Sequence, residues 1–140
     1  MRGWTLVFDL DGTLVDTAPD LAAATNHVLS KFNLAPVGER DIRPFVGHGA
    51  LAMIAEALRS HGRKVSDEDL LDLFEIFITH YTARIADSSR PYPGILAALD
   101  AYQNEGAALA VCTNKIEAHA KMLLDALDMS RYFSAVTGRD

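Results

Sequence analysis

The sequence reads LVFDLDGTLVD over residues 6–16, and the rest of the chain is organised around this stretch. The apolar run Thr5–Phe8 predicts a short buried strand, and a carboxylate, Asp9, stands where that strand ends. Asp11-Gly12 is a turn signal, and Leu14-Val15 forms a second, very short apolar run. A carboxylate at the end of an apolar strand costs desolvation energy unless it meets a cation or hydrogen-bond donors. The stretch is therefore a candidate functional site.

A β-hairpin is the alternative interpretation of the same residues, because Asp-Gly between two apolar runs is a strong hairpin signal. In that case both aspartates serve only a turn. Two observations oppose it: the second arm is very short, and a turn needs one acid whereas this stretch has two, Asp9 and Asp11. The spacing alone leaves the two interpretations equally open.

From Thr17 to Asp87 the apolar residues recur with helical spacing. The pattern predicts a helix that begins near Thr17, a second over Ala50–Ser60, and a third that begins after Ser66 and continues to about Ile85. Ser66 and Asp69 form a capping-box pair at the start of the third helix.

The segment Asp87–Gly94 contains two prolines and a glycine, which break both helix and strand, so it marks a boundary. After it the pattern alternates between helices and strands, and this alternation predicts a parallel sheet with crossover helices. The expected elements are a helix over Ile95–Glu105, a strand over Ala107–Cys112, a helix over Lys115–Leu127 and a strand from Ala135-Val136.

The predicted fold class is α/β, with a partial Rossmann-like parallel sheet core interrupted by a helical cap. The core comprises residues 1–16 and 88–140 and is incomplete, and the cap comprises residues 17–87. Ligands of open α/β sheets bind at the carboxyl ends of the strands. A helical block inserted directly after the acidic strand end is therefore placed as a lid over a binding site.

Composition excludes several classes of protein. With 49% hydrophobic and 23% charged residues, the chain is typical of a soluble globular protein. Its net charge of -6 argues against a nucleic acid or an anionic membrane as the main partner. An acidic protein repels anionic substrates, and a bound divalent cation would offset that repulsion locally.

One cysteine, Cys112, rules out an intramolecular disulfide, and its apolar neighbours predict a buried thiol in a reducing compartment. The apolar run at the start is too short for a signal peptide, and no stretch approaches the length of a membrane span. We therefore expect a cytoplasmic protein.

A pair of carboxylates separated by one residue suits phosphoryl transfer. A carboxylate held in line with phosphorus can attack it to give an acyl phosphate. The transfer also needs a cation on the phosphoryl oxygens and a proton for the leaving oxygen. Mg²⁺ prefers few carboxylates, several waters and substrate oxygens. One acid of the pair can attack while the other gives and takes the proton.

Residues 6–16 resemble the first motif of the haloacid dehalogenase-like hydrolase superfamily, whose members also carry a helical cap inserted after this motif. The resemblance implies that Asp9 is the nucleophile and a Mg²⁺ ligand. It implies that Asp11 is the general acid/base, with its backbone carbonyl on the metal, and that Gly12 contributes to phosphate binding. An acid at the second position points to the phosphatase branch of the superfamily.

A second candidate site is Val111–Lys115. By itself it is an ordinary strand-to-helix junction, in which Asn114 and Glu117 form a capping box. A hydroxyl and free backbone N–H groups at a helix start can also cradle a phosphate. Thr113 resembles the superfamily's second motif, which binds phosphoryl oxygens. Thr113-Asn114-Lys115 resembles the phosphoglycolate phosphatase-like group, which adds Asn114 to the expected phosphate ligands.

Within the helical block, the stretch 43–50 places glycines on both sides of His48. Such a stretch is ordinarily a turn before a helix, but the phosphoglycolate phosphatase-like group carries a similar one in a cap loop that faces the active site. The resemblance makes Arg43, His48 and Lys115 candidate contacts for a substrate carboxylate. Residues 90–94 resemble that group's hinge from cap to core.

The resemblance implies a Mg²⁺-dependent phosphomonoester hydrolase acting through an aspartyl-phosphate on a small phosphorylated metabolite, with 2-phosphoglycolate the best choice. Other small sugar-phosphate phosphatases, phosphomutases and pyrophosphatases of the superfamily stay open, as does a non-catalytic truncated binding module. A helical interaction domain with an incidental hairpin is a third class.

The superfamily's third motif, a lysine, and its fourth, an acidic pair, have no counterpart in these residues. We therefore expect a fragment with little phosphatase activity and weak magnesium affinity. We also expect an open, apolar edge on the first strand, which invites self-association.

Overall fold

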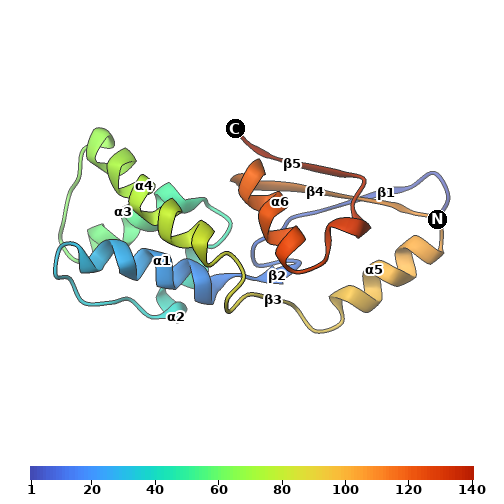
Figure 1. The fold of residues 1–140 in the computed structure, drawn as a ribbon, viewed down its shortest axis with the longest axis horizontal. Helices are drawn as coiled ribbons and strands as arrows, with labels where there is room; N and C mark the ends of the chain where they lie inside the picture. Colours follow the sequence, from blue (N-terminus) through green and yellow to red (C-terminus); the bar gives the residue numbers. More distant parts are fainter.

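A three-stranded parallel sheet forms one end of the molecule in the computed structural model, which describes residues 1–140 (Figure 1). Its strands lie in the order β1 (Thr5–Phe8), β4 (Ala108–Ile116) and β5 (Ala135–Arg139). Phe8 lies opposite Val111 in the register of β1 and β4. The carboxyl ends of β1 and β4 therefore lie next to each other.

Two helices accompany this sheet: α5 (Ile95–Asn104) contacts β4, and α6 (Glu117–Ala126) packs on β4 and β5. The short helix η2 (Ser130–Tyr132) precedes β5. Apolar side chains of these elements and of the turn after β1 form one buried cluster, which includes Leu10, Leu14, Leu109, Val111 and Leu123. Burial of these side chains provides the main stabilisation of the sheet part.

A block of helices forms the other end of the molecule (Figure 1). It comprises α1 (Ala18–Ser30), α2 (Glu39–Ile42), η1 (Arg43–Phe45), α3 (Ala50–Ser60) and α4 (Asp67–Ala83). A second buried cluster lies among these helices and draws its members from α1, α2, α3 and α4. Each part of the molecule thus has its own apolar core.

Two short strands connect the parts. β2 (Val15–Asp16), on the way into the helical block, pairs antiparallel with β3 (Arg90–Pro91), on the way out. Figure 1 shows the two connections side by side. Asp20 reinforces this junction, because its carboxylate accepts hydrogen bonds from Ser88 N at 2.9 Å and Ser89 Oγ at 2.6 Å.

The helices and strands expected from the sequence are present, and the helix begun by Ser66 is capped as predicted, with Asp69 N donating to Ser66 Oγ at 3.1 Å. The hairpin interpretation is wrong, because β1 pairs in parallel with β4 and not with the residues after Gly12. The helices α2, η1 and η2 were not expected.

Several local predictions are wrong. Arg90–Pro91 is a strand although its segment was predicted to break strands, since a proline at the end of a two-residue edge pairing removes no needed donor. β4 continues to Ile116, so α6 begins at Glu117. The capping box of Asn114 and Glu117 does not form: Ile116 precedes α6 without a side-chain cap, and the Asn114 amide donates to another residue.

Cys112 is exposed, not buried as predicted. Side chains alternate along a strand, and in β4 its neighbours Val111 and Thr113 are the buried ones. Cys112 therefore lies on the opposite face of the sheet. No helix of the chain has the length and apolarity needed to cross a membrane.

Candidate active site at the carboxyl end of the sheet

Asp9 is the first residue after β1 and is exposed. Its Oδ1 accepts a hydrogen bond of 2.8 Å from the backbone N–H of Leu10. No lysine, arginine or other side chain pairs with this carboxylate, so Oδ2 is open to an incoming group. The position suits a carboxylate that reacts with, or binds, a ligand at the sheet edge.

Asp11 is only two residues away but lies in a different environment, because it is 7% exposed. Its Oδ1 accepts hydrogen bonds from Thr17 Oγ1 at 2.8 Å and from Lys115 Nζ at 3.0 Å. Both contacts go to the same oxygen, and no protein donor contacts Oδ2. Asp11 is thus fixed in place by one oxygen, while the other has no partner in the protein.

Lys115, at the end of β4, balances the buried charge of Asp11. Its side chain is 8% exposed, and its Nζ lies 4.6 Å from the ring centre of Tyr81 on α4. Burial by itself would lower the pKa of Lys115, but the nearby Asp11 carboxylate and Tyr81 outweigh burial and the pKa is raised. Lys115 therefore stays charged, and its ammonium links the sheet to the helical block.

Tyr81 is 2% exposed, and its hydroxyl has no hydrogen-bond partner. Burial raises the pKa of this hydroxyl, and the charge of Lys115 opposes part of that effect. The group is therefore a neutral donor.

Thr113 is buried at the tip of β4, two residues beyond the partner of Phe8. Its Oγ1 accepts a hydrogen bond from Lys115 N at 3.1 Å, and its own O–H has no acceptor in the protein. The register of β1 and β4 thus brings this hydroxyl to the same edge as Asp9 and Asp11. A free donor beside two carboxylates is a suitable contact for a phosphoryl oxygen.

Two other expected phosphate ligands are engaged elsewhere. The backbone N–H of Gly12 donates to Val15 O at 2.9 Å, within the turn that follows Asp11. The side-chain amide of Asn114 donates to Gly47 O at 2.9 Å and so fastens the sheet tip to the loop before α3. Any phosphate contact by these two groups needs a change in these bonds.

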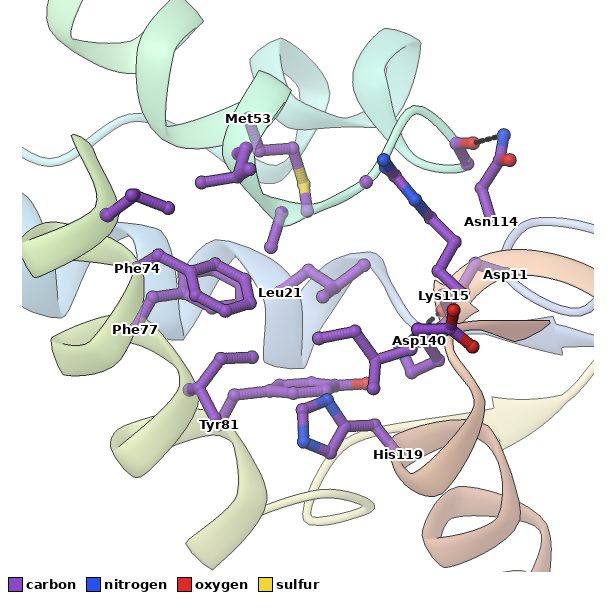
Figure 2. A pocket seen from close by; sticks show the side chains of 18 residues that line it. Asp11, Leu21, Met53, Phe74, Phe77, Tyr81, Asn114, Lys115, His119 and Asp140 are labelled. Atoms are coloured by element: carbon purple, nitrogen blue, oxygen red, sulfur yellow. Dashed lines mark hydrogen bonds and ion pairs between the residues drawn. The ribbon is translucent and has the colours of Figure 1, made fainter. Parts of the chain in front are cut away.

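A cavity of about 210 Å³ lies between the sheet tip and the helical block. Figure 2 shows its two ends: Asp11, Lys115 and Asn114 lie on the sheet side, and Phe74, Phe77 and Met53 lie on the helical side. His119 of α6 also lines it, and burial together with the charge of Lys115 lowers the pKa of His119. The cavity is polar at one end and apolar at the other.

The two other expected substrate contacts lie away from this cavity. Arg43 pairs with Asp16 at 3.1 Å and with Glu39 at 3.5 Å on the protein surface. His48 is exposed, with its ring 6.2 Å from that of Phe45 in an edge-on arrangement. Of the three residues predicted to contact a substrate carboxylate, only Lys115 lines the cavity.

Oxygen atoms available to a metal are few. No three His, Cys, Asp or Glu side chains form a group that could hold one. Oδ2 of Asp9 and the main-chain carbonyl of Asp11 accept no hydrogen bond from the protein. Mg²⁺ prefers such oxygens and keeps several waters. The two groups fit part of the coordination shell of this ion.

Sequence reasoning missed Tyr81, His119 and Arg139 as lining residues. Tyr81 was expected only as one of the apolar residues on the buried face of α4. Helical spacing predicts which side of a helix is buried, but not that a hydroxyl on that side reaches the end of a strand 34 positions later in the chain. Asp9 and Asp11, in contrast, were indicated by a local sequence pattern, an apolar strand that ends in acids.

Comparisons with a family model and with known proteins both point to the haloacid dehalogenase-like hydrolases. Residues 6–140 match the family model described as haloacid dehalogenase-like hydrolase. A phosphoglycolate phosphatase of Agrobacterium fabrum is 48% identical over 134 residues, which are 96% of this chain and 58% of that protein. One of Caulobacter vibrioides is 44% identical over 140 residues, which are 100% of this chain and 59% of that protein.

Solved structures of related proteins have a similar fold. A structure from Haemophilus somnus, described as a predicted phosphoglycolate phosphatase, superposes with a TM-score of 0.85 at 29% identity. The match covers 98% of this chain and 62% of that one. A structure from Lactobacillus delbrueckii gives a TM-score of 0.88 at 23% identity and supports the fold alone. The chain spans about three fifths of the length of these relatives.

Proposed function

The chain belongs to the haloacid dehalogenase-like hydrolase family, and from that premise we propose that it carries the reacting carboxylates of a Mg²⁺-dependent phosphomonoester hydrolase. Phosphatases of this family are generally Mg²⁺-dependent, and the ion would be held by Asp9 and by the carbonyl of Asp11. When bound, it would neutralise charge on the phosphoryl group.

The observation that carries the proposal is the difference between the two acids. Asp9 is exposed and has no ion pair, so its Oδ2 is free to attack. Asp11 is buried and held by Thr17 and Lys115 through Oδ1, which leaves Oδ2 to handle a proton. Two neighbouring carboxylates with different environments can take different roles in one reaction.

The reaction would run in two steps. An oxygen of Asp9 attacks phosphorus, and the bond from phosphorus to the substrate oxygen breaks. Asp11 would enter this step with a proton on Oδ2, left there by the water of the preceding cycle, and would give it to the leaving oxygen. Water then attacks the aspartyl-phosphate, gives a proton to Asp11 and displaces the Asp9 carboxylate, which releases inorganic phosphate. Thr113, with support from Gly12 and Asn114 after rearrangement, would hold the phosphoryl oxygens.

The named relatives are phosphoglycolate phosphatases, so 2-phosphoglycolate is our first choice among small phosphorylated metabolites. Lys115 would contact the substrate carboxylate, and Arg43 and His48 could join it only if the loop before α3 moved. We propose that residues 17–87 act as the cap over a core of residues 1–16 and 88–140, in a cytoplasmic protein. The separate apolar clusters of the two parts support that division.

The test is capture of a phosphoryl mimic on Asp9. Beryllium fluoride and Mg²⁺ are added to the 140-residue chain, and ¹⁹F NMR reports any bound adduct. We expect a bound signal that needs Mg²⁺, is lost in Asp9→Asn and persists in Asp72→Asn, a matched change on the exposed face of α4. An adduct that survives in Asp9→Asn, or none in the unmodified chain at saturating Mg²⁺, would remove Asp9 from the proposed role.

A further inference from the structure

A second cavity, of about 370 Å³, lies within the helical block between α2–η1 and α3. Its volume falls in the range of about 300–1,000 Å³ that is common for small-molecule sites. Its apolar lining comes from the loop before α2, from α2, from η1 and from α3: Val37, Ile42, Pro44, Phe45, Met53 and Ala57. The polar residues of its lining are Arg40, Asp41, Glu56 and Ser60. Three of these four are exposed, so the cavity opens to solvent.

Two of the charged groups in this lining are not balanced by the protein. Both oxygens of Glu56 accept hydrogen bonds from Arg59, so the charge of Glu56 is neutralised. Arg40 forms no ion pair, and neither does Asp41, which accepts only a long hydrogen bond of 3.4 Å from a backbone N–H through Oδ2. The cavity therefore offers one free cation and one free anion beside an apolar surface.

A ligand that matches this lining carries both charges and an apolar group. A simple anion would be attracted by Arg40 and repelled by Asp41, and a simple cation would meet the reverse arrangement. A zwitterion leaves neither side chain without a partner. An α-amino acid with an apolar side chain is the smallest molecule of this kind, and an aromatic side chain can also pack on the ring of Phe45.

Met53 connects this cavity with the one at the sheet tip. It is 2% exposed and is the one residue that lines both cavities. Figure 2 shows its side chain on the helical side of the cavity at the sheet tip. Methionine has three rotatable bonds and adapts its shape to its surroundings. A ligand that presses on Met53 from one cavity therefore changes the shape of the other.

The backbone after η1 makes a second connection. Phe45 lines the second cavity, and two residues later the carbonyl of Gly47 accepts a hydrogen bond of 2.9 Å from the side-chain amide of Asn114. Between them, Val46 lies against the turn that follows Asp11, because a Cβ placed on Gly12 would be 3.4 Å from Val46 Cγ1. A shift of η1 would thus be felt at the sheet tip.

We infer that the cavity between α2–η1 and α3 is a second ligand site, for an apolar α-amino acid, and that its occupation is transmitted to the sheet tip through Met53 and residues 45–47. The carboxylate of the ligand binds Arg40, its ammonium binds Asp41, and its side chain contacts the apolar lining. This ligand is not the phosphorylated substrate, and the inference does not depend on the proposed reaction. By linkage, any effect of the amino acid on ligand affinity at the sheet tip is reciprocal.

The test compares four small molecules by titration into the 140-residue chain, with NMR chemical shifts of the Val37 and Ala57 methyl groups reporting binding. Phenylalanine has all three features, 3-phenylpropionate lacks the ammonium, phenethylamine lacks the carboxylate, and glycine lacks the apolar group. We expect phenylalanine to bind about threefold or more tighter than either singly charged analogue, since contacts between exposed charges are modest. Glycine should bind about tenfold or more weakly than phenylalanine, because it buries no ring.

Two pairs of variants assign the charged contacts. Arg40→Met keeps the aliphatic stem and should remove the advantage of phenylalanine over phenethylamine, whereas Lys64→Met on the surface should leave it. Asp41→Asn should remove the advantage of phenylalanine over 3-phenylpropionate, whereas Asp72→Asn on the exposed face of α4 should leave it. If a variant and its surface control behave alike, the assigned contact is wrong.

The side-chain amide signal of Asn114 reports transmission, because Asn114 does not line the second cavity. Saturation with phenylalanine should shift this signal and that of the Met53 methyl group. The side-chain amide of Gln103, which donates to a backbone carbonyl at 3.0 Å in the sheet part, should not move. Ala57→Val narrows the second cavity and should weaken binding and both shifts, and Ala55→Val, which lines neither cavity, should not.

The site is refuted if phenylalanine shifts no signal of the second cavity, or if either singly charged analogue binds as tightly as phenylalanine. Transmission is refuted if phenylalanine binds without shifting the Asn114 signal, or if the Gln103 signal shifts equally. None of these measurements involves Asp9 or phosphoryl chemistry. The beryllium fluoride experiment can therefore fail while this site stands, and this site can fail while the Asp9 adduct forms.

Discussion

At the scale of single residues, Gly138 in β5 lies where another residue would not fit. A Cβ at this position would lie 2.5 Å from Lys115 O and 2.7 Å from the Glu117 Cα. Both atoms belong to the backbone that leads from β4 into α6, so they cannot move aside cheaply. We expect Gly138→Ala to lower the free energy of unfolding by about 1–3 kcal/mol, measured by urea denaturation.

Gly38→Ala is the matched control, since its nearest atom would be Asp41 Oδ2 at 3.7 Å and the backbone there is not left-handed. Gly38→Ala should lower the free energy of unfolding far less than Gly138→Ala does. Equal losses in the two variants would show that crowding at the strand tip is not the cause.

Asp20 makes the second prediction at this scale. It is buried and accepts from Ser88 N and from the fully buried Ser89 hydroxyl. Asp20→Ala leaves both donors unpaired and should cost about 2–4 kcal/mol of unfolding free energy. Asp67→Ala changes an exposed acid in the first turn of another helix, α4, and serves as the comparison in the same urea experiment. A smaller loss at Asp20 than at Asp67 would contradict the importance of this junction.

At the scale of elements, α1 and α4 meet through a pair of histidines. The rings of His27 and His80 stack with centroids 4.4 Å apart. Burial lowers the pKa of His80, and the neighbouring His27 and Arg84 lower it further. In the folded state His80 therefore binds a proton less readily than in the unfolded chain, where its pKa is about 6.5.

The lowered pKa of His80 makes the free energy of unfolding depend on pH. Between the lowered pKa and about 6.5 the unfolded chain binds more protons, so stability rises with pH and falls on acidification. We expect the urea midpoint to decrease as pH drops from neutral through this window. His80→Phe keeps an aromatic ring against His27 and should show a smaller decrease. Parallel curves for the variant and the unmodified chain would rule out His80 as a source of the pH dependence.

The elements also show what could be predicted from sequence. The helices α1, α3 and α4 were found because their apolar residues recur with helical spacing over at least ten positions. β3 was missed because two residues carry no period, and its pairing with β2 depends on residues 74 and 76 positions earlier in the chain. The end of β4 was misplaced because Asn114 has the sequence of a cap but donates instead to Gly47.

At the scale of the whole molecule, one edge strand of the sheet carries exposed apolar side chains. β1 is an edge strand, and Trp4 and Val7 near its outer face are 64% and 62% exposed. An open edge with apolar side chains favours pairing with another chain. We expect the 140-residue chain to self-associate in sedimentation velocity as its concentration rises. Val7→Lys should reduce this association, and Leu96→Lys on α5 should not; a monomer at all concentrations would refute the expectation.

The candidate site illustrates the same limit of sequence reasoning at the largest scale. Asp9 and Asp11 were identified because an apolar strand that ends in acids is a local signal. Thr113 followed from the resemblance of its segment to the superfamily's second motif. Tyr81 could not be found this way, since its role depends on how the helical block rests on the sheet. Cys112 was misplaced because the sequence does not reveal that one face of the sheet lacks a covering layer.

The pairing of β2 with β3 has a consequence for how such a molecule could be altered or could have arisen. The chain leaves and re-enters the sheet part at adjacent positions, with Asp16 opposite Arg90. A short turn could therefore join these residues directly and would remove the helices without stretching the remaining backbone. The same geometry would let a different set of helices be transplanted onto an unchanged pair of carboxylates. Chemistry and selectivity can then be exchanged as separate modules, by a single insertion at one point of the gene.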